Sequence, residues 1–189
     1  LIHCTVVAGL LDFRLYNADG TRAEMSGNGI RCMVQAAVDA GLPEAKGREV
    51  KVRTPAGIKD VAVFDETQPG LRLASVEMGQ PAITLEGPAA RVDMGNPHLV
   101  LRVDDPERAP LEQFGHKHPD LNVELITVRS RELVEMRVHE RGVGETLACG
   151  TGACAVAFAA HHWGLVDDNV TVRQRGGDAT VAVIDGRVV

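Results

Sequence analysis

With 189 residues, the chain is long enough for one large domain or two small ones. Its hydrophobic content of 44% and charged content of 24% are typical of a globular protein, and its net charge of −6 argues against a general nucleic-acid binder. No apolar run is long enough to span a membrane, and the four cysteines form neither a CxxC pair nor a secreted disulfide framework, which favours a reduced, cytoplasmic setting.

Alternating polar and apolar residues predict strands along most of the chain, separated by turns rich in glycine and proline. In chain order these strands are Asp12–Tyr16, Glu49–Arg53, Val61–Phe64, Arg72–Met78, His98–Val103, Asn122–Val128, Leu133–His139, Val170–Arg173 and Ala179–Ile184. Two helices are predicted among them, roughly at Gly29–Ala40 and Gly152–Trp163. The segment from Arg108 to Asp120 is predicted to be a long loop.

Both predicted helices are apolar almost all round, a pattern typical of helices that are buried on every side. Cys32 and Cys154 lie one turn into these helices, so we expect both in the core. The simplest architecture is an α+β fold of two pseudo-symmetric lobes, each a β-sheet or barrel-like wrap around one central buried helix. We expect the boundary near residues 68–70, giving an N-terminal lobe of residues 1–70 and a C-terminal lobe of residues 71–189.

The two helices begin from the same local pattern, which occurs twice in the chain. Ser26-Gly-Asn-Gly-Ile-Arg-Cys32 and Cys149-Gly-Thr-Gly-Ala-Cys154 each lead into an apolar stretch, and 149 − 26 and 152 − 29 both give an offset of 123. Two halves built alike can present equivalent groups to one ligand from opposite sides, and inversion of a stereocentre needs that geometry. The leading residue is a serine in the first half and a cysteine in the second.

A glycine-rich turn at a helix start leaves backbone N–H groups unpaired, which makes an anion site. Cys149 falls at the N-cap position, where the helix dipole favours a thiolate and lowers a thiol pKa; the alternative is a small hydrophobe buried in a turn. Ser26 is interpreted as an ordinary N-cap, because its hydroxyl satisfies an orphan N–H and an alcohol is a poor base near neutral pH.

Other kinds of site find little support. The third glycine and the acidic residue of a dinucleotide fingerprint are missing, as is the lysine of a phosphate-binding loop. No HExxH or paired CxxC predicts a metal, and the adjacent His161 and His162 cannot share one helix face. His98 follows a turn and is either a satisfied structural histidine or a pocket residue. Glu140 and Arg141 are either a solvated ion pair or, beside Cys149, a clamp for a carboxylate.

Four stretches together closely resemble the diaminopimelate epimerase family across essentially the whole chain: Asn17-Ala-Asp-Gly20, Glu24-Met-Ser-Gly-Asn-Gly-Ile-Arg-Cys32, Met94-Gly-Asn-Pro-His98 and Glu140-Arg-Gly-Val-Gly-Glu-Thr-Leu-Ala-Cys-Gly-Thr-Gly-Ala-Cys154. The resemblance implies a cofactor-independent epimerase that interconverts LL- and meso-diaminopimelate in lysine and peptidoglycan synthesis. In that family one cysteine from each lobe flanks the α-carbon; a thiolate removes the proton and the opposite thiol supplies another.

Carried over by motif, Cys149 matches the second catalytic cysteine, and Ser26 stands where the first belongs. The resemblance makes His98 and Glu140 polar supports of the catalytic centre. Substrate binding is implied for the helix starts, which would hold the α-carboxylate through Gly27, Asn28, Gly150 and Thr151. It is also implied for residues that would fix the distal amino-acid end: Asn17, Asn96, Asn122, Glu140 and Arg141. It implies no cofactor and no metal. We expect an amino-acid substrate and neither nucleic acid nor a membrane as partners, and leave a homodimer open.

Two departures from the family separate this chain from a complete epimerase. The resemblance implies further strands before Leu1, including a substrate-contacting asparagine, and a last strand region after Val189, so we expect the sequence to be a piece of a longer protein. Ser26 also removes one acid–base group. The serine is then an engineered change, a natural variant with another proton carrier, or the sign of a one-base dehydratase of the proline racemase-like class; a non-catalytic amino-acid-binding variant is the fourth alternative.

Overall fold

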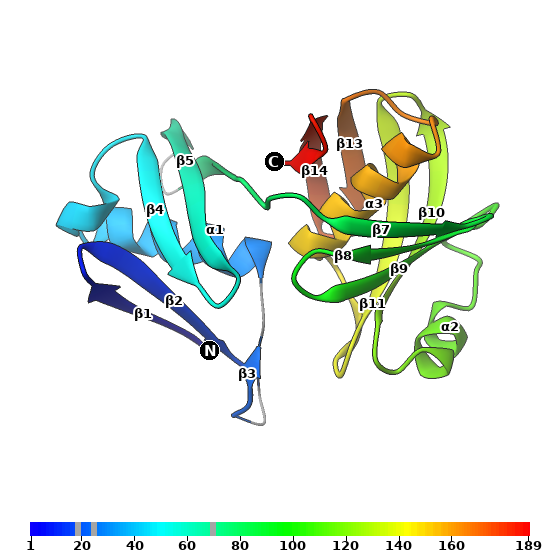
Figure 1. The fold of residues 1–189 in the computed structure, drawn as a ribbon, viewed down its shortest axis with the longest axis horizontal. Helices are drawn as coiled ribbons and strands as arrows, with labels where there is room; N and C mark the ends of the chain where they lie inside the picture. Colours follow the sequence, from blue (N-terminus) through cyan, green and yellow to red (C-terminus); the bar gives the residue numbers. More distant parts are fainter. Residues whose placement is uncertain (18–19, 24–25, 69–70) are drawn as a thin grey trace. The chain divides into compact units, whose positions relative to one another are not determined.

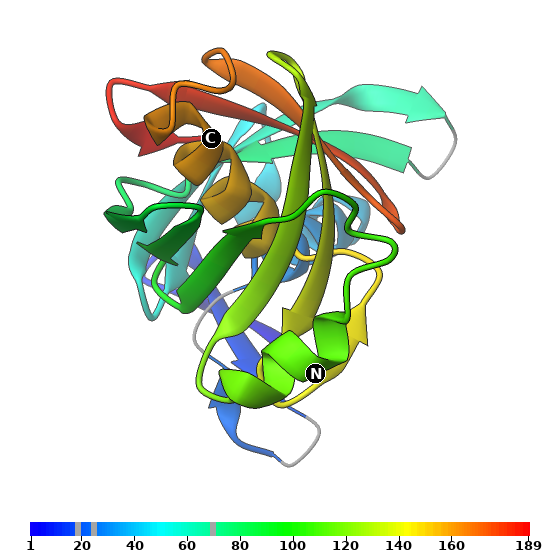
Figure 2. The same cartoon turned by 90° about the vertical axis from the view of Figure 1, so that its right-hand side faces the viewer.

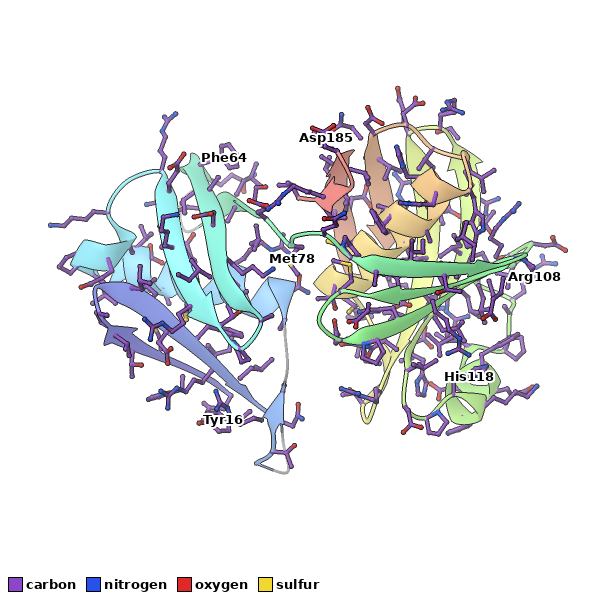
Figure 3. The ribbon with its side chains drawn as sticks, viewed as in Figure 1. Tyr16, Phe64, Met78, Arg108, His118 and Asp185 are labelled. Carbon is purple, nitrogen blue, oxygen red and sulfur yellow. The ribbon has the colours of Figure 1, made fainter. Side chains whose placement is uncertain are left out.

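The computed structural model describes residues 1–17, 20–23, 26–68 and 71–189. Four residues of the recognised motifs (Ala18, Asp19, Glu24 and Met25) and the end of the predicted lobe boundary (Pro69 and Gly70) lie outside them. The chain divides into two compact units, Leu1–Met78 and Gly79–Val189. Met78 is labelled in Figure 3. The division falls later than residues 68–70 because the strand after them pairs within the first unit.

The first unit is a curled sheet with a helix on it, seen in blue to cyan in Figure 1. The sheet order is β1-β2-β4-β5-β6, with β3 paired to β2. Its elements are β1 (Ile2–Val7), β2 (Leu10–Tyr16), β3 (Arg22–Ala23), α1 (Gly27–Asp39), a 3-10 helix η1 (Pro43–Ala45), β4 (Glu49–Thr54), β5 (Gly57–Gln68) and β6 (Leu71–Val76). Strand β1 has no counterpart among the predicted strands.

The second unit contains a larger sheet in the order β15-β14-β13-β11-β10-β9-β8-β7, with β12 paired to β11. Helix α3 contacts the strands from β8 to β11 together with β13 and β14. Helix α2 packs on β10 and β11 (Figure 2). The elements are β7 (Ala82–Glu86), β8 (Ala89–Asp93), β9 (Pro97–Arg102), α2 (Leu111–Lys117), β10 (Asn122–Ser130), β11 (Leu133–Glu140), β12 (Gly144–Thr146), α3 (Gly150–His162), β13 (Asn169–Gln174), β14 (Gly177–Ile184) and β15 (Arg187–Val188).

The sequence repeat is a repeat of topology. In each unit a central strand pairs antiparallel with the strand before it, β1 with β2 and β10 with β11, and parallel with the strand that follows the helix, β2 with β4 and β11 with β13. The register is retained: Leu15 pairs with Ala23, and Val138 pairs with Thr146 at the same offset. The α+β architecture of two similar units is therefore confirmed.

Both helices also end alike. The amide of Leu42 donates to Ala37 O and that of Leu165 to Ala160 O, both at 3.0 Å. The intervening Gly41 and Gly164 take φ values of +68° and +71°, the left-handed turn that glycine adopts without a steric penalty. Gly41-Leu42 and Gly164-Leu165 thus terminate the two helices in the same way.

The two helices differ in burial. Every residue of α3 from Thr151 to Ala160 is buried, as predicted. On α1 the prediction was wrong: only one face is buried, including Ile30, Met33, Val34 and Ala37, and Cys32 is exposed. The buried positions follow the i, i+3, i+4, i+7 spacing of an amphipathic helix, and three of the four residues between them, Arg31, Cys32 and Ala36, are exposed.

The predicted loop from Arg108 to Asp120 was also wrong, because it contains α2, whose C-cap His118 is labelled in Figure 3. Leu111 of α2 is buried against Leu99, Val123 and Leu125. Strands alternate their side chains between faces, so Glu124 of β10 points away from this cluster, toward the face where α3 lies. That alternation places a carboxylate beside the start of α3.

Candidate active site

Cys149 is the N-cap of α3 in the second unit. Its backbone is extended, with φ −129° and ψ 117°, and its Sγ accepts from the Gly152 amide at 3.3 Å. The Thr151 hydroxyl lies 3.4 Å from the same sulfur. The thiol is 5% exposed. Two hydrogen-bonding groups therefore converge on one buried sulfur at a helix N-terminus.

The environment raises the pKa of Cys149 to about 12. Burial is the main cause, followed by the carboxylates of Glu140 and Glu124, while the hydrogen bonds from Thr151 and Gly152 oppose it. The sequence predicted a lowered pKa from the helix start alone. That prediction was wrong in direction, because the helix-start donors are present but burial and the two carboxylates outweigh them.

The loop before Cys149 is held by the hairpin between β13 and β14. The Cys149 amide donates to the Gln174 side chain at 2.8 Å, and the Gly176 amide donates to Leu147 O at 2.7 Å. Gln174 is itself buried. This residue was not recognised from the sequence, and nothing in a glutamine at the end of a strand indicates such a role.

Residues from β9 and β10 continue the site beside Cys149. Asn96, just before β9, donates from Nδ2 to Thr151 Oγ1 at 3.3 Å, and its Oδ1 lies 3.1 Å from His98 Nε2. His98 Nδ1 lies 2.6 Å from Glu124 Oε1, with both side chains fully buried. His98 is thus a fully bonded histidine that is also linked to the neighbourhood of the cysteine. Glu124 is the second residue that the sequence did not single out.

Three of the five residues expected at the distal end of a ligand, Asn122, Glu140 and Arg141, lie together where β10 begins and β11 ends. Asn122, at the start of β10, donates to Pro97 O and accepts the Arg141 amide, both at 3.0 Å. Glu140, at the end of β11, accepts from the Thr146 hydroxyl. Arg141 follows directly and is exposed. Gly150 and Thr151 form the first turn of α3, whose leading amides have no acceptor within the helix.

In the first unit Ser26 caps α1 in the same way. Its Oγ accepts from the Gly29 amide at 3.0 Å, with an extended backbone of φ −151° and ψ 110°. Gly27 and Asn28 form the first turn of α1, and Asn28 accepts from Arg31. Asn17 follows β2 and donates to Thr21 Oγ1 at 3.0 Å. The N-cap interpretation of Ser26 is confirmed.

The described residues of the chain contain no group of three or more His, Cys, Asp or Glu side chains arranged to hold a metal ion. His161 pairs with Asp168 and His162 with Phe158 O, so the two adjacent histidines turn to different partners. Among the same residues, no helix combines the length and the apolar character needed to cross a membrane.

The whole chain is similar to proteins of one known family. The family model for diaminopimelate epimerase matches residues 3–84 and 90–187. Diaminopimelate epimerase of Pelotomaculum thermopropionicum is 36% identical over 95% of this chain and 73% of its own length. O-ureido-serine racemase of Streptomyces lavendulae is 35% identical over 96% of this chain and 74% of its own length.

Two solved structures share the fold at low sequence identity. An epimerase of Pseudomonas aeruginosa, titled as predicted, superposes with a TM-score of 0.77 at 18% identity, covering 99% of this chain and 78% of that one. A hydroxyproline epimerase of Agrobacterium vitis gives 0.67 at 17% identity, covering 94% and 66%. With a family model matched along nearly its whole length, the chain belongs to the diaminopimelate epimerase family of isomerases.

Proposed function

We propose that the protein interconverts LL- and meso-diaminopimelate by transfer of the α-proton, without a cofactor, as a step of lysine and peptidoglycan synthesis. The observation that carries this proposal is the buried Cys149 sulfur with the Thr151 hydroxyl and the Gly152 amide directed at it. Both groups stabilise a thiolate once the proton has left, and a buried thiolate is a strong base because its neutral form is favoured.

The α-carboxylate of the substrate is assigned to the helix starts. The leading amides of Gly150 and Thr151 suit an anion, as do those of Gly27 and Asn28 in the equivalent turn of α1. A carboxylate at a helix N-terminus also acidifies the neighbouring α-proton, because the amides take up part of the charge that develops when the proton leaves.

A second polar end of the substrate is assigned to the cluster of Asn96, Asn122, Glu140 and Arg141, and to Asn17 of the first unit. A distal ammonium and carboxylate need both an acceptor and a cation, and Glu140 and Arg141 supply one of each. The names of the relatives agree with this assignment, since diaminopimelate and O-ureido-serine each carry polar groups far from the α-carbon. Proline has no such end, which makes proline racemase chemistry the weaker candidate.

Because position 26 is a serine, we expect proton transfer at only one face of the α-carbon. Its hydroxyl occupies the position equivalent to Cys149, but an alcohol neither accepts nor supplies an α-proton readily near neutral pH. Cys149 can still remove the proton from the isomer that presents it. We therefore expect exchange of the α-hydrogen to be faster than inversion for one isomer, and nearly absent for the other.

The test is incubation of the protein in D₂O with LL-diaminopimelate, meso-diaminopimelate and trans-4-hydroxy-L-proline, followed by NMR and chiral chromatography. Deuterium should enter one diaminopimelate isomer before it inverts, and Cys149→Ala should abolish this exchange. Loss of water from hydroxyproline would instead establish the one-base dehydratase. Binding of diaminopimelate without exchange would establish the non-catalytic alternative, and equal, fast inversion of both isomers would show that another group replaces the first cysteine.

A further inference from the structure

The pair formed by His98 and Glu124 is the most deeply buried pair of titratable side chains at the site. The two side chains are 0% exposed, and Nδ1 lies 2.6 Å from Oε1. Glu124 Oε2 has no hydrogen-bond partner among the described residues. A buried carboxylate is costly unless it is paired, so its bond to His98 compensates for most of its burial.

This pair is connected to Cys149 by an unbroken series of polar side chains. His98 Nε2 lies 3.1 Å from Asn96 Oδ1, Asn96 Nδ2 lies 3.3 Å from Thr151 Oγ1, and Thr151 Oγ1 lies 3.4 Å from Cys149 Sγ. Each contact joins one group that donates to one that accepts. The direction of the first bond therefore decides whether the Thr151 hydroxyl is free to donate to sulfur or is already used as a donor to Asn96.

In the arrangement of the structure, both ring nitrogens of His98 face acceptors, the Glu124 carboxylate and the Asn96 carbonyl. The pair must then hold one proton more than a neutral imidazole beside a carboxylate. Asn96 donates from its nitrogen to Thr151, which leaves the Thr151 hydroxyl hydrogen free to be directed at the Cys149 sulfur. Thr151 and the Gly152 amide are then both donors, an arrangement that stabilises a thiolate.

If the Asn96 side-chain amide rotates by 180°, its oxygen and nitrogen exchange places, and the donor and acceptor of each hydrogen bond between His98 and Cys149 exchange roles. Its nitrogen donates to a neutral His98, its carbonyl accepts from the Thr151 hydroxyl, and Thr151 accepts from the Cys149 thiol. The two arrangements contain the same number of protons and the same net charge. They differ in the position of one proton, which lies either on the pair formed by His98 and Glu124 or on the Cys149 sulfur.

We propose that Glu124 is a positioning residue that keeps a proton on His98, so that Asn96 and Thr151 direct a donor at Cys149 and favour its thiolate. This inference rests on the proposed function in taking Cys149 as the base. The titratable groups that bear on the sulfur are the carboxylates of Glu140 and Glu124 and, through the network, His98. The coupling itself is measurable without any substrate.

The proposal and a simple charge effect predict opposite results. The Glu124 carboxylate raises the pKa of Cys149 through its charge, so charge alone predicts that Glu124→Gln makes the thiol more acidic and more reactive. Through the network, the same substitution removes the counter-charge that holds a proton on His98. The amide then turns, Thr151 stops donating to sulfur, and the thiol becomes less reactive.

The experiment measures alkylation of Cys149 by iodoacetamide at fixed pH, with peptide mass spectrometry to distinguish Cys149 from the other cysteines. We expect Glu124→Gln to slow alkylation about tenfold, corresponding to about one pKa unit, and the exposed Glu132→Gln to leave it unchanged. Thr151→Val, which removes the hydroxyl but keeps the shape, should slow it as well. Glu124 and Thr151 act through the same series of hydrogen bonds. Alkylation in the double variant should therefore be no slower than in the slower of the two single variants.

Nitrogen NMR of histidine-labelled protein provides an independent readout. At any one pH, the fraction of His98 that carries hydrogen on both ring nitrogens should be lower in Glu124→Gln than in the parent protein, because the variant lacks the carboxylate that faces Nδ1. Faster alkylation in Glu124→Gln, fully additive effects, or an equal fraction of doubly protonated His98 in the parent and in Glu124→Gln would each overturn the proposal. Near-ultraviolet circular dichroism confirms that the variants are folded. If the coupling is present but diaminopimelate is not turned over, the proposed function fails and this inference stands.

Discussion

Ser26 and Cys149 make the same hydrogen bond in two different units, each accepting from the amide of a glycine three residues further on. The distances are 3.0 Å to Gly29 and 3.3 Å to Gly152, and each residue caps a helix of 13 residues. Oxygen and sulfur are therefore interchangeable as caps at these positions. They are not interchangeable as acids, because a thiol gives up its proton far more readily than an alcohol. The two positions are therefore equivalent in structure but not in chemistry.

Ser26→Cys should increase inversion of diaminopimelate in both directions. A cysteine retains the capping bond, as Cys149 shows, and adds a group that can exchange protons. General acid–base groups typically contribute about 10²–10⁴-fold, so we expect a gain of at least about 100-fold in the slower direction. Ser26→Ala is the control; it should lose only the cap, about 1 kcal/mol of stability. No gain from Ser26→Cys would mean that this position does not transfer protons.

Arg141→Ala should weaken diaminopimelate binding far more than it changes folding. The Arg141 backbone amide, which bonds Asn122, is retained in the variant, so the local structure should persist. Leaving a charged ligand group without its partner typically costs about 1–3 kcal/mol or more. Calorimetric titration measures the affinity, with Arg131→Ala as the control, since Arg131 pairs with Asp167 on the surface. Equal affinities of parent and Arg141→Ala would remove Arg141 from the site.

Gly152→Ala should destabilise the protein more than Gly29→Ala. A Cβ at Gly152 would lie 2.8 Å from Glu124 Oε1, a buried atom that His98 holds in place. At Gly29 the nearest atoms would be 3.1 Å away, on Phe13 and Ser26. Overpacking typically costs about 1–3 kcal/mol, against about 1 kcal/mol gained from the helix propensity of alanine. Urea unfolding of both variants compares them; the reverse order would show that Glu124 can move.

Acid should destabilise the protein partly through Glu145. Arg137 donates to both carboxylate oxygens at 2.8 Å and, with burial opposing it, lowers the pKa of Glu145. A carboxyl whose pKa is lower when folded stabilises the protein above the unfolded value of about 4.3, and this contribution is lost as pH falls through the folded pKa.

The corresponding measurement is the free energy of unfolding in urea between about pH 6 and pH 3. Glu145→Gln should flatten this dependence by an amount of the order of 1 kcal/mol or less, given partial exposure. Glu107→Gln should change the pH dependence of the free energy of unfolding less. The Glu107 side chain is 60% exposed, so solvent screens its bond to Arg175 more fully. An unchanged pH dependence in Glu145→Gln would mean that Arg137 stabilises the two forms of the carboxyl equally.

The sequence predicted most of the fold and the two capping residues, Ser26 and Cys149, because both depend on local patterns. Polar and apolar residues alternate along the strands, and the helices begin at capping residues and end at Gly-Leu. Each of these signals lies within a few residues of the sequence. It missed β7 and β8, because such short strands give only a few alternating positions. It missed Glu124 and Gln174 because their roles arise from contacts 25 or 26 residues away. The pKa of Cys149 depends on burial in the folded sheet, which no local motif encodes.

The bond from the Cys149 amide to Gln174 makes the chemistry of the helix start depend on a hairpin near the C-terminal end of the sequence. The two-residue turn Arg175-Gly176, which joins the paired Gln174 and Gly177, determines where that glutamine lies. The Gly176 amide also donates to Leu147 O. Random mutagenesis screened for lost activity should therefore recover changes in this hairpin as often as changes around the cysteine itself. Such mutants would retain every residue of the conspicuous glycine-rich motif, yet they would behave as active-site mutants.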